Sequence, residues 1–287
     1  MRCLSTNDTS ALSIQNSKFW VGLESMLPLK SLREPLILVC DSRDRFLDDD
    51  YEFEALLRLF SLEIQHKILS RKNQSLRNTA LCNQILQLTG ISTVTGLDFR
   101  SLKLEYTPYG KPVCPAMTGL AFNMSNSDGL TAMYLDAAPN VGIDLASTRE
   151  CLNFGDGYLE TFKSIFSARE LDSLEQTPAG SLRDRKFTHY WSLKEAYTKL
   201  TGTGLNCDLS AIDIGTLEPW QPTDVVQTML RDINGERIIF QSQWLKTDVV
   251  VSVCKRTDSQ SQTPEKIPAC VTELRIAELA AYLHSTK

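Results

Sequence analysis

The sequence lacks paired cysteines and long apolar runs. Its eight cysteines are scattered without a Cys-x-x-Cys pair, which argues against a zinc site and is typical of proteins from a reducing compartment. No apolar stretch approaches the length needed to span a bilayer, and the N-terminal region has no apolar core behind a basic start. We therefore expect a soluble, cytoplasmic protein without membrane contact.

A strong charge of one sign is also missing. The formal net charge is −5 over 287 residues, so the chain does not have the basic character of a dedicated nucleic-acid binder. Any site for an anionic ligand has to come from a local cluster of Lys and Arg. With 42% hydrophobic and 23% charged residues, the composition is that of an ordinary globular protein, and the length suits two α/β lobes.

Hydrophobic periodicity predicts helices followed by strands, and then the same order again. The first part begins with a buried strand over 35–40 and continues as helices from about 50 to 90, with Gly90 at a helix C-terminus. Residues 1–20 are interpreted as a frayed end and 255–268 as a surface linker. The other expected elements are strands over 102–106, 120–124, 130–135 and 141–145, a capping box at Ser167–Glu170, a long helix over 182–200, strands over 211–214, 237–245 and 249–254, and a helix over 272–283.

This order of elements predicts an α+β fold made of two similar α/β lobes in a pseudo-twofold arrangement. The expected division is an N-terminal lobe over 1–138, a C-terminal lobe over 139–254, and a linker with a C-terminal helix over 255–287. No repeat visible in the sequence relates the two halves.

An acidic side chain lies at the end of a predicted buried strand in the second half of the chain. Asp144 lies in the apolar run Val-Gly-Ile-Asp-Leu over 141–145. A carboxylate in such a strand is poorly solvated unless a partner compensates its charge, and a bound cation is one such partner. The alternative is an Asp that caps the following turn.

A second candidate lies in the long predicted helix. Trp191, Glu195 and Lys199 are spaced four residues apart, so they share one helix face. An indole, a carboxylate and an ammonium on one face can serve stacking, metal binding and charge neutralisation. The alternative is an exposed Glu–Lys pair near a helix C-terminus, although Trp191 indicates a partly buried face.

A third candidate combines a tight turn with a strand end. Lys111, in the stretch Gly-Lys-Pro over 110–112, lies beside a predicted type I turn over 107–110, and the later stretch Phe-Asn-Met-Ser-Asn-Ser over 122–127 supplies hydroxyl and amide groups. Such groups hold phosphate oxygens in proteins. Taken singly, they are ordinary turn residues.

Together these three motifs, GKP followed by FNMS, GIDL and WSLKEAYTK, resemble the phosphopantetheinyl transferase family of the larger, pseudodimeric kind. Three motifs in the right order make the resemblance specific, and it runs from about residue 50 to 254. The stretches FEAL over 53–56, VTGL over 94–97 and TGTGL over 201–205 are similar to the yeast subgroup that activates the aminoadipate reductase of lysine biosynthesis.

The resemblance implies a magnesium-dependent transfer of phosphopantetheine from coenzyme A to a serine of an apo carrier protein. Asp144 and Glu195 would ligate Mg²⁺, whose preference for oxygen ligands suits them. The carrier serine would attack the β-phosphorus, with Glu195 as the base and 3′,5′-ADP as the leaving group. Lys199 would stabilise or protonate the leaving phosphate.

The resemblance also implies a coenzyme A site, with the adenine and 3′-phosphate on the N-terminal lobe and the metal on the C-terminal one. Lys111 and Arg77 match positions that hold the 3′-phosphate and adenine end. Ser125 matches a phosphate-contacting hydroxyl, and Asn126 follows it. Lys72 is a further candidate, although a solvated surface lysine is an equal interpretation.

Two residues depart from the common bacterial pattern. Ala146 stands where a second carboxylate is usual, so coenzyme A would supply more of the metal's ligands. Asn126 stands where histidine is common and adds no positive charge. Two other residues, Lys194 and Glu170, match motif positions but are expected to contribute less, because Glu170 already has a structural use in the capping box.

Two other functional classes remain open: a non-catalytic coenzyme A or carrier-binding module, and a helical scaffold with incidental motifs. For the transferase, the expected partner is the carrier domain of aminoadipate reductase, with no nucleic acid, and the chain is expected to act as a monomer. The charged run over 183–186 either contacts the acidic carrier or is a solvated helix start.

Overall fold

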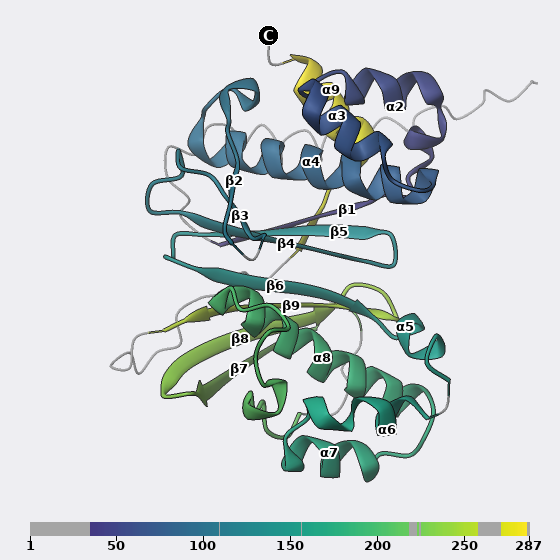
Figure 1. Cartoon of the computed structure of the whole chain (residues 1–287), viewed down its shortest axis with the longest axis vertical. Helices are drawn as coiled ribbons and strands as arrows, with labels where there is room; N and C mark the ends of the chain where they lie inside the picture. The colour runs from purple at the N-terminus through teal and green to yellow at the C-terminus, as the bar shows by residue number, and fades with distance from the viewer. Residues whose placement is uncertain are drawn as a thin grey trace, which may run out of the picture.

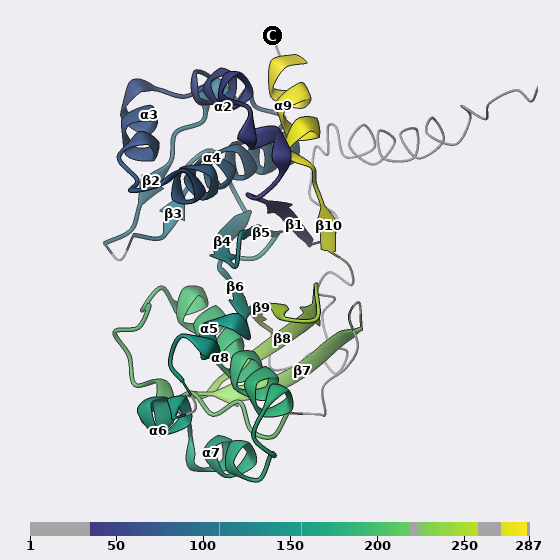
Figure 2. The same cartoon turned by 90° about the vertical axis from the view of Figure 1, so that its right-hand side faces the viewer.

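The computed structural model describes residues 35–108, 110–155, 157–217, 223, 225–257 and 271–285. The expected frayed end over 1–20 and most of the linker over 255–268 lie outside these residues. Two four-stranded sheets face each other in the middle of the described structure, and helices cover their outer faces (Figures 1 and 2). The fold is therefore of the mixed α/β class. Among the described residues, no helix combines the length and apolar character needed to cross a membrane.

The first sheet has the strand order β10-β1-β5-β4. Strand β1 pairs antiparallel with β5, β5 pairs antiparallel with β4, and the late strand β10 pairs parallel with β1. A small ladder of β2 and β3 lies beside it. The elements are β1 Leu36–Asp41, α2 Asp50–Leu57, α3 Leu62–Leu69, α4 Gln74–Thr95, β2 Glu105–Tyr106, β3 Pro112–Val113, β4 Ala121–Ser127, β5 Leu130–Asp136, β10 Val271–Glu273 and α9 Ile276–Ser285.

The second sheet has the order β6-β9-β8-β7, with every neighbouring pair antiparallel. Helix α8 packs along β6 and β9 on the outer face, and the shorter helices surround it (Figure 1). The elements are β6 Val141–Ser147, α5 Arg149–Leu152, α6 Tyr158–Phe162, α7 Ala168–Glu175, α8 Ser181–Thr201, β7 Val226–Ile233, β8 Glu236–Trp244 and β9 Val249–Arg256.

The inner faces of the two sheets form a continuous apolar core. Ile37 and Tyr134 of the first sheet belong to the same buried cluster as Ile143 and Val251 of the second. Because β6 and β9 are covered on both faces, they are buried along almost their whole length, which explains their continuous apolar sequences. This packing fixes β4 against β6, where the candidate site lies.

The long helix predicted over 182–200 is confirmed as α8, and the predicted capping box is confirmed at the start of α7. Gly90 was wrongly placed at a helix end. Helix α4 continues to Thr95 and ends at Gly96, which adopts the left-handed φ of 70°, whereas Gly90 packs closely against Met133.

The strand predicted over 211–214 is also wrong. Leu209–Ala211 is a 3₁₀ turn, and the segment after it is irregular. Its carbonyl groups are used elsewhere, because the ammonium of Lys194 binds the carbonyl oxygens of Leu209 and Ile212. The helix predicted over 272–283 is shortened at its start, since β10 occupies its first residues.

Lys194 and Glu170 form an ion pair with both side chains fully buried, at 2.8 Å. The Glu170 carboxylate also accepts hydrogen bonds from the backbone N–H groups of Ser167 and Ile214. Each charged group is therefore fully compensated, and the pair ties α7 and α8 to the segment after the 3₁₀ turn. This network has a structural role, in keeping with the minor part expected for both residues.

We expect Lys194→Met to lower the free energy of unfolding by about 3–5 kcal/mol, because it leaves the Glu170 carboxylate buried without its cation. Urea titration measures the change. The matched control is Lys163→Met, which removes an exposed lysine paired with Glu160 and should change stability by less than about 0.5 kcal/mol. Equal effects of the two substitutions would contradict the assignment.

Candidate active site

The site depends on an unusually close approach of α8 to β6. A Cβ atom at Gly142 would lie 1.9 Å from the backbone oxygen of Ala196, so only glycine fits this position. The contact sets the helix directly on the strand that carries Asp144. It brings the Asp144 carboxylate within reach of Glu195 and Lys199, which follow Trp191 along one face of α8.

Lys199 forms an ion pair with Asp144. Its Nζ lies 2.7 Å from Asp144 Oδ1, and the two side chains are 26% and 7% exposed. Ser125 of β4 completes the contact, since its hydroxyl donates to Asp144 Oδ1 at 3.0 Å and accepts from Lys199 Nζ at 2.9 Å. Residues from β4, β6 and α8 therefore meet at one point.

The hydrogen-bonding capacity of Ser125 is fully used. Its hydroxyl donates its one hydrogen to Asp144, and it accepts from Lys199 and from the backbone N–H of Leu145. A hydroxyl offers one donor and two acceptor positions. Ser125 can therefore donate to a phosphate only by releasing Asp144. Lys199 uses two of its three N–H groups among the described residues, so one remains for an anionic ligand.

Lys111 and Asn123 bind the same two backbone carbonyls. Both side chains donate to Val141 O in β6 and to Lys199 O in the last turn of α8, at 3.0–3.2 Å. The Lys199 carbonyl is one of those that a helix end leaves without a partner inside the helix. A cation at this end of a helix is also electrostatically favourable. The two residues thus hold the end of α8 that carries Lys199.

Glu195 is an acidic residue whose carboxylate has no hydrogen-bond or ion-pair partner among the described residues. Partial burial and the negative charge of Asp144 raise the pKa of Glu195 to about 6. Burial also raises the pKa of Asp144, while the Lys199 ammonium and the Ser125 hydroxyl oppose that rise.

These two carboxylates fit a magnesium ion. The Oδ2 atom of Asp144 is buried and has no hydrogen-bond partner among the described residues, so it is an oxygen that a cation can compensate. Magnesium is usually held by one or two carboxylates together with substrate phosphates. A group of three His, Cys, Asp or Glu side chains able to hold a metal is absent from the described part of the chain, and such a pair does not require one.

The other predicted residues lie apart from this cluster. Lys72 and Asn126 are exposed and Arg77 is half-buried, and no hydrogen bond or ion pair among the described residues joins them to Asp144 or Lys199. Within the described part of the chain, the Arg77 guanidinium forms one hydrogen bond, to the backbone oxygen of Arg71. Arg77 and Lys72 are therefore available to an external anion, as is the third N–H of Lys111.

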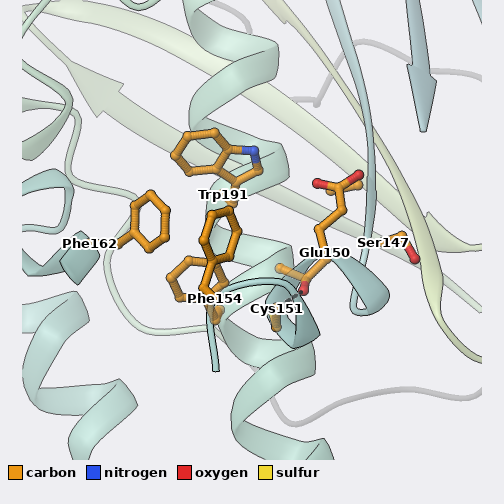
Figure 3. Close-up of a pocket in the computed structure, with 9 residues that line it drawn as sticks. Ser147, Glu150, Cys151, Phe154, Phe162 and Trp191 are labelled. Carbon is orange, nitrogen blue, oxygen red and sulfur yellow. Dashed lines mark hydrogen bonds between the residues drawn. The ribbon is translucent and has the colours of Figure 1, made fainter. Parts of the chain in front are cut away.

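An apolar cavity of about 370 Å³ adjoins the cluster. Figure 3 shows Phe154, Phe162 and Trp191 on one side of it and Glu150 with Ser147 on the other. Trp191 packs edge-on against Phe162, with ring centroids 6.1 Å apart. Trp191 lies one helical turn before Glu195 on α8 and Ala146 lies two residues after Asp144 on β6, so two neighbours of these acidic residues line the cavity.

Residues 140–254 match the 4′-phosphopantetheinyl transferase superfamily. The L-aminoadipate-semialdehyde dehydrogenase-phosphopantetheinyl transferase of Saccharomyces cerevisiae is 40% identical over 76% of this chain and 79% of its own length. The chain belongs to this family. The protein of the same name from Eremothecium gossypii is 34% identical over 84% of this chain and 86% of its own length. The 4′-phosphopantetheinyl transferase Sfp of Bacillus subtilis is 28% identical over 60% and 72%.

The position of Ala146 explains one departure from the common family pattern. Its side chain is 1% exposed and packs with Trp244, Val250 and Trp191. A carboxylate there would lose its solvation among apolar groups. The wall of the site at this position is therefore hydrophobic in this family member.

The candidate motifs contain Asn123, Ser127 and Gly142, but the sequence predicted no individual role for any of the three in the site. Asn123, Ser125 and Ser127 alternate along β4, and a polar residue at every second position indicates one polar strand face. That signal was available. The partner of each side chain was not, because it depends on how the two sheets are placed.

We expect Gly142→Ala to destabilise the protein by at least about 2 kcal/mol, since the new methyl group forces α8 away from β6. Thermal and urea unfolding measure this change. Gly157→Ala is the matched control, because a Cβ there meets no atom within 4 Å. A stable Gly142→Ala variant with unchanged unfolding would contradict the close packing described here.

We expect Glu195→Gln to be more stable than the parent chain at pH 8 in EDTA. The folded protein raises the pKa of Glu195 to about 6, so folding disfavours the ionised carboxylate above that pH. The advantage of the variant should shrink as the pH falls through 6 and disappear below the ordinary glutamate pKa of about 4.3. Urea unfolding at several pH values tests this, with the exposed Glu175→Gln as the control. A variant that is less stable at pH 8 would overturn it.

Proposed function

We propose that this chain transfers 4′-phosphopantetheine from coenzyme A to a serine of an apo carrier domain and releases 3′,5′-ADP. The observation that carries this proposal is the convergence of Asp144 from β6 with Glu195 and Lys199 from α8 at one partly buried point. Two carboxylates and an ammonium suit the binding of a diphosphate through a divalent cation. Membership of the transferase family supports the same chemistry.

The reaction forms one phosphorus–oxygen bond and breaks another. The carrier serine oxygen attacks the β-phosphorus of coenzyme A, its proton passes to Glu195, and the bond to 3′,5′-ADP breaks. Above pH 6 Glu195 is mostly ionised and can accept that proton. Lys199 donates its remaining N–H to the leaving phosphate. Magnesium, held by Asp144 and Glu195, would supply positive charge to the diphosphate.

The proposed coenzyme A site spans both sheets. Lys111 has one N–H left for a phosphate while it holds the end of α8. Arg77 and Lys72 would bind the 3′-phosphate and adenine end, and Asn126 lies beside Ser125 on β4. The apolar cavity next to Trp191 has a volume of about 370 Å³ and would accept the pantetheine arm.

The proposed partner is the carrier domain of aminoadipate reductase in lysine biosynthesis. The support is that the yeast relatives carry the name of L-aminoadipate-semialdehyde dehydrogenase. The basic run at the start of α8 gives little support, because Arg183 binds Thr177 O, Arg185 binds Thr247 O and Lys186 binds Ser173 O. Monomeric state, cytoplasmic location and the absence of nucleic acid stay predictions.

We also propose that the two halves, divided near residue 138, are related by a pseudo-twofold axis. In the first half a strand, β1, is followed by the long helix α4 and then by antiparallel strands whose last member, β5, returns to pair with β1. In the second half β6, α8 and β9 repeat this pattern. Both long helices end at a glycine with left-handed φ, Gly96 and Gly202.

The decisive assay incubates the chain with coenzyme A, Mg²⁺ and the apo carrier domain and measures the added phosphopantetheine by intact mass spectrometry. We expect Glu195→Gln and Lys199→Met each to lower the transfer rate at least about 100-fold. Glu175→Gln, an equal charge change on the exposed end of α7, should have no effect. Transfer at the parent rate in Glu195→Gln would refute its role, and coenzyme A binding without transfer by the parent chain would refute the activity.

A further inference from the structure

One face of β4 places three polar side chains against the second sheet. Asn123, Ser125 and Ser127 alternate along the strand and therefore point the same way. Asn123 binds the end of α8, and Ser125 binds Asp144. Ser127 donates to Glu150 Oε1 of α5 at 2.6 Å. The third position of this row thus holds a carboxylate that the transfer mechanism above does not use.

Glu150 belongs electrostatically to the same site. The negative charges of both Asp144 and Glu150 act on Glu195, and that of Asp144 acts on Glu150. Lys199 is the one ammonium paired with this group among the described residues. The three carboxylates therefore carry more negative charge than this ammonium neutralises, which favours a cation beside them.

An independent observation points to a ligand at this place. The Asp144 side chain is 7% exposed, and its Oδ2 atom has no hydrogen-bond partner among the described residues. A buried carboxylate oxygen without a partner is destabilising unless a cation compensates it. Glu150, labelled in Figure 3, and Ala146 line the same cavity, so Glu150 reaches the side of the site on which Ala146 lacks a carboxylate.

We propose that Glu150, oriented by Ser127, supplies to the magnesium site the carboxylate that is absent at Ala146. It acts as a positioning residue through one of the water molecules that magnesium retains in proteins. This explains why α5 follows β6 so closely and why a hydroxyl on β4 fixes the Glu150 side chain. The inference rests on the proposed function, because it assumes that Asp144 and Glu195 bind the metal.

The test measures Mn²⁺ binding to the full chain in the presence of coenzyme A and without a carrier, so that no turnover occurs. The loss of the free Mn²⁺ signal in electron paramagnetic resonance gives the Kd. We expect Glu150→Gln to raise this Kd about tenfold, as substitutions of groups that support metal ligands do. Glu150→Asp, which keeps the charge, should restore part of the affinity. Glu175→Gln is the matched control and should bind Mn²⁺ like the parent chain.

The transfer assay adds a second readout. In Glu150→Gln, the Mg²⁺ concentration for half-maximal rate should rise about tenfold, while the rate at saturating Mg²⁺ stays close to that of the parent. Urea unfolding verifies that the variant is folded. An unchanged Mn²⁺ Kd in folded Glu150→Gln would overturn the role of Glu150 alone. A parent chain that binds no Mn²⁺ with coenzyme A would overturn the metal pair itself, so the two failures are distinguishable.

Discussion

The contact between α8 and β6 at Gly142 is the constraint on which the site depends. Asp144 is carried by β6, and Glu195 and Lys199 are carried by α8, so the separation of these two elements sets the distance between the three charged groups. Because a single methyl group would meet the backbone of Ala196 at 1.9 Å, the spacing is fixed by backbone packing and not by flexible side chains. Rigid backbone packing of this kind holds the catalytic groups in place before the substrate binds.

The hydrogen bonds around this contact are distributed unevenly. Ser125 has used its full capacity and Asn123 both of its N–H groups within the protein, whereas Lys199 and Lys111 each keep one N–H that no described residue accepts. The carboxylates also keep unused acceptor positions. Glu195 has no hydrogen-bond partner among the described residues, and one oxygen of Asp144 has none there either. The site therefore holds positive and negative groups with unused hydrogen-bonding capacity, supported by neutral groups whose N–H and O–H donors are all used. This pattern favours a ligand that carries both phosphate oxygens and a cation.

The sequence predicted the elements that depend on local pattern. The long helix α8, its stripe of Trp191, Glu195 and Lys199, and the capping box at Ser167 follow from spacing alone. Residues whose role depends on the meeting of distant segments were not predictable. Glu150 acquires a role only because β4 lies against β6, and Lys194 has its partner in a different helix. The short strand β10 was mistaken for the start of a helix, since its pairing with β1 joins segments more than two hundred residues apart.

The return of the chain to the first sheet has a consequence for biosynthesis. Strand β10 pairs with β1, and α9 packs against α4 and buries Leu279 and Leu283 in the core of the first half. The ribosome delivers these segments after the entire second sheet, so the half made first is the last to be completed. Until then β1 presents an open edge, the kind of surface on which nascent chains aggregate. A premature stop codon after β9 would thus leave β6 and its Asp144 in the chain. It would remove β10 and α9, which complete the half that was synthesised first.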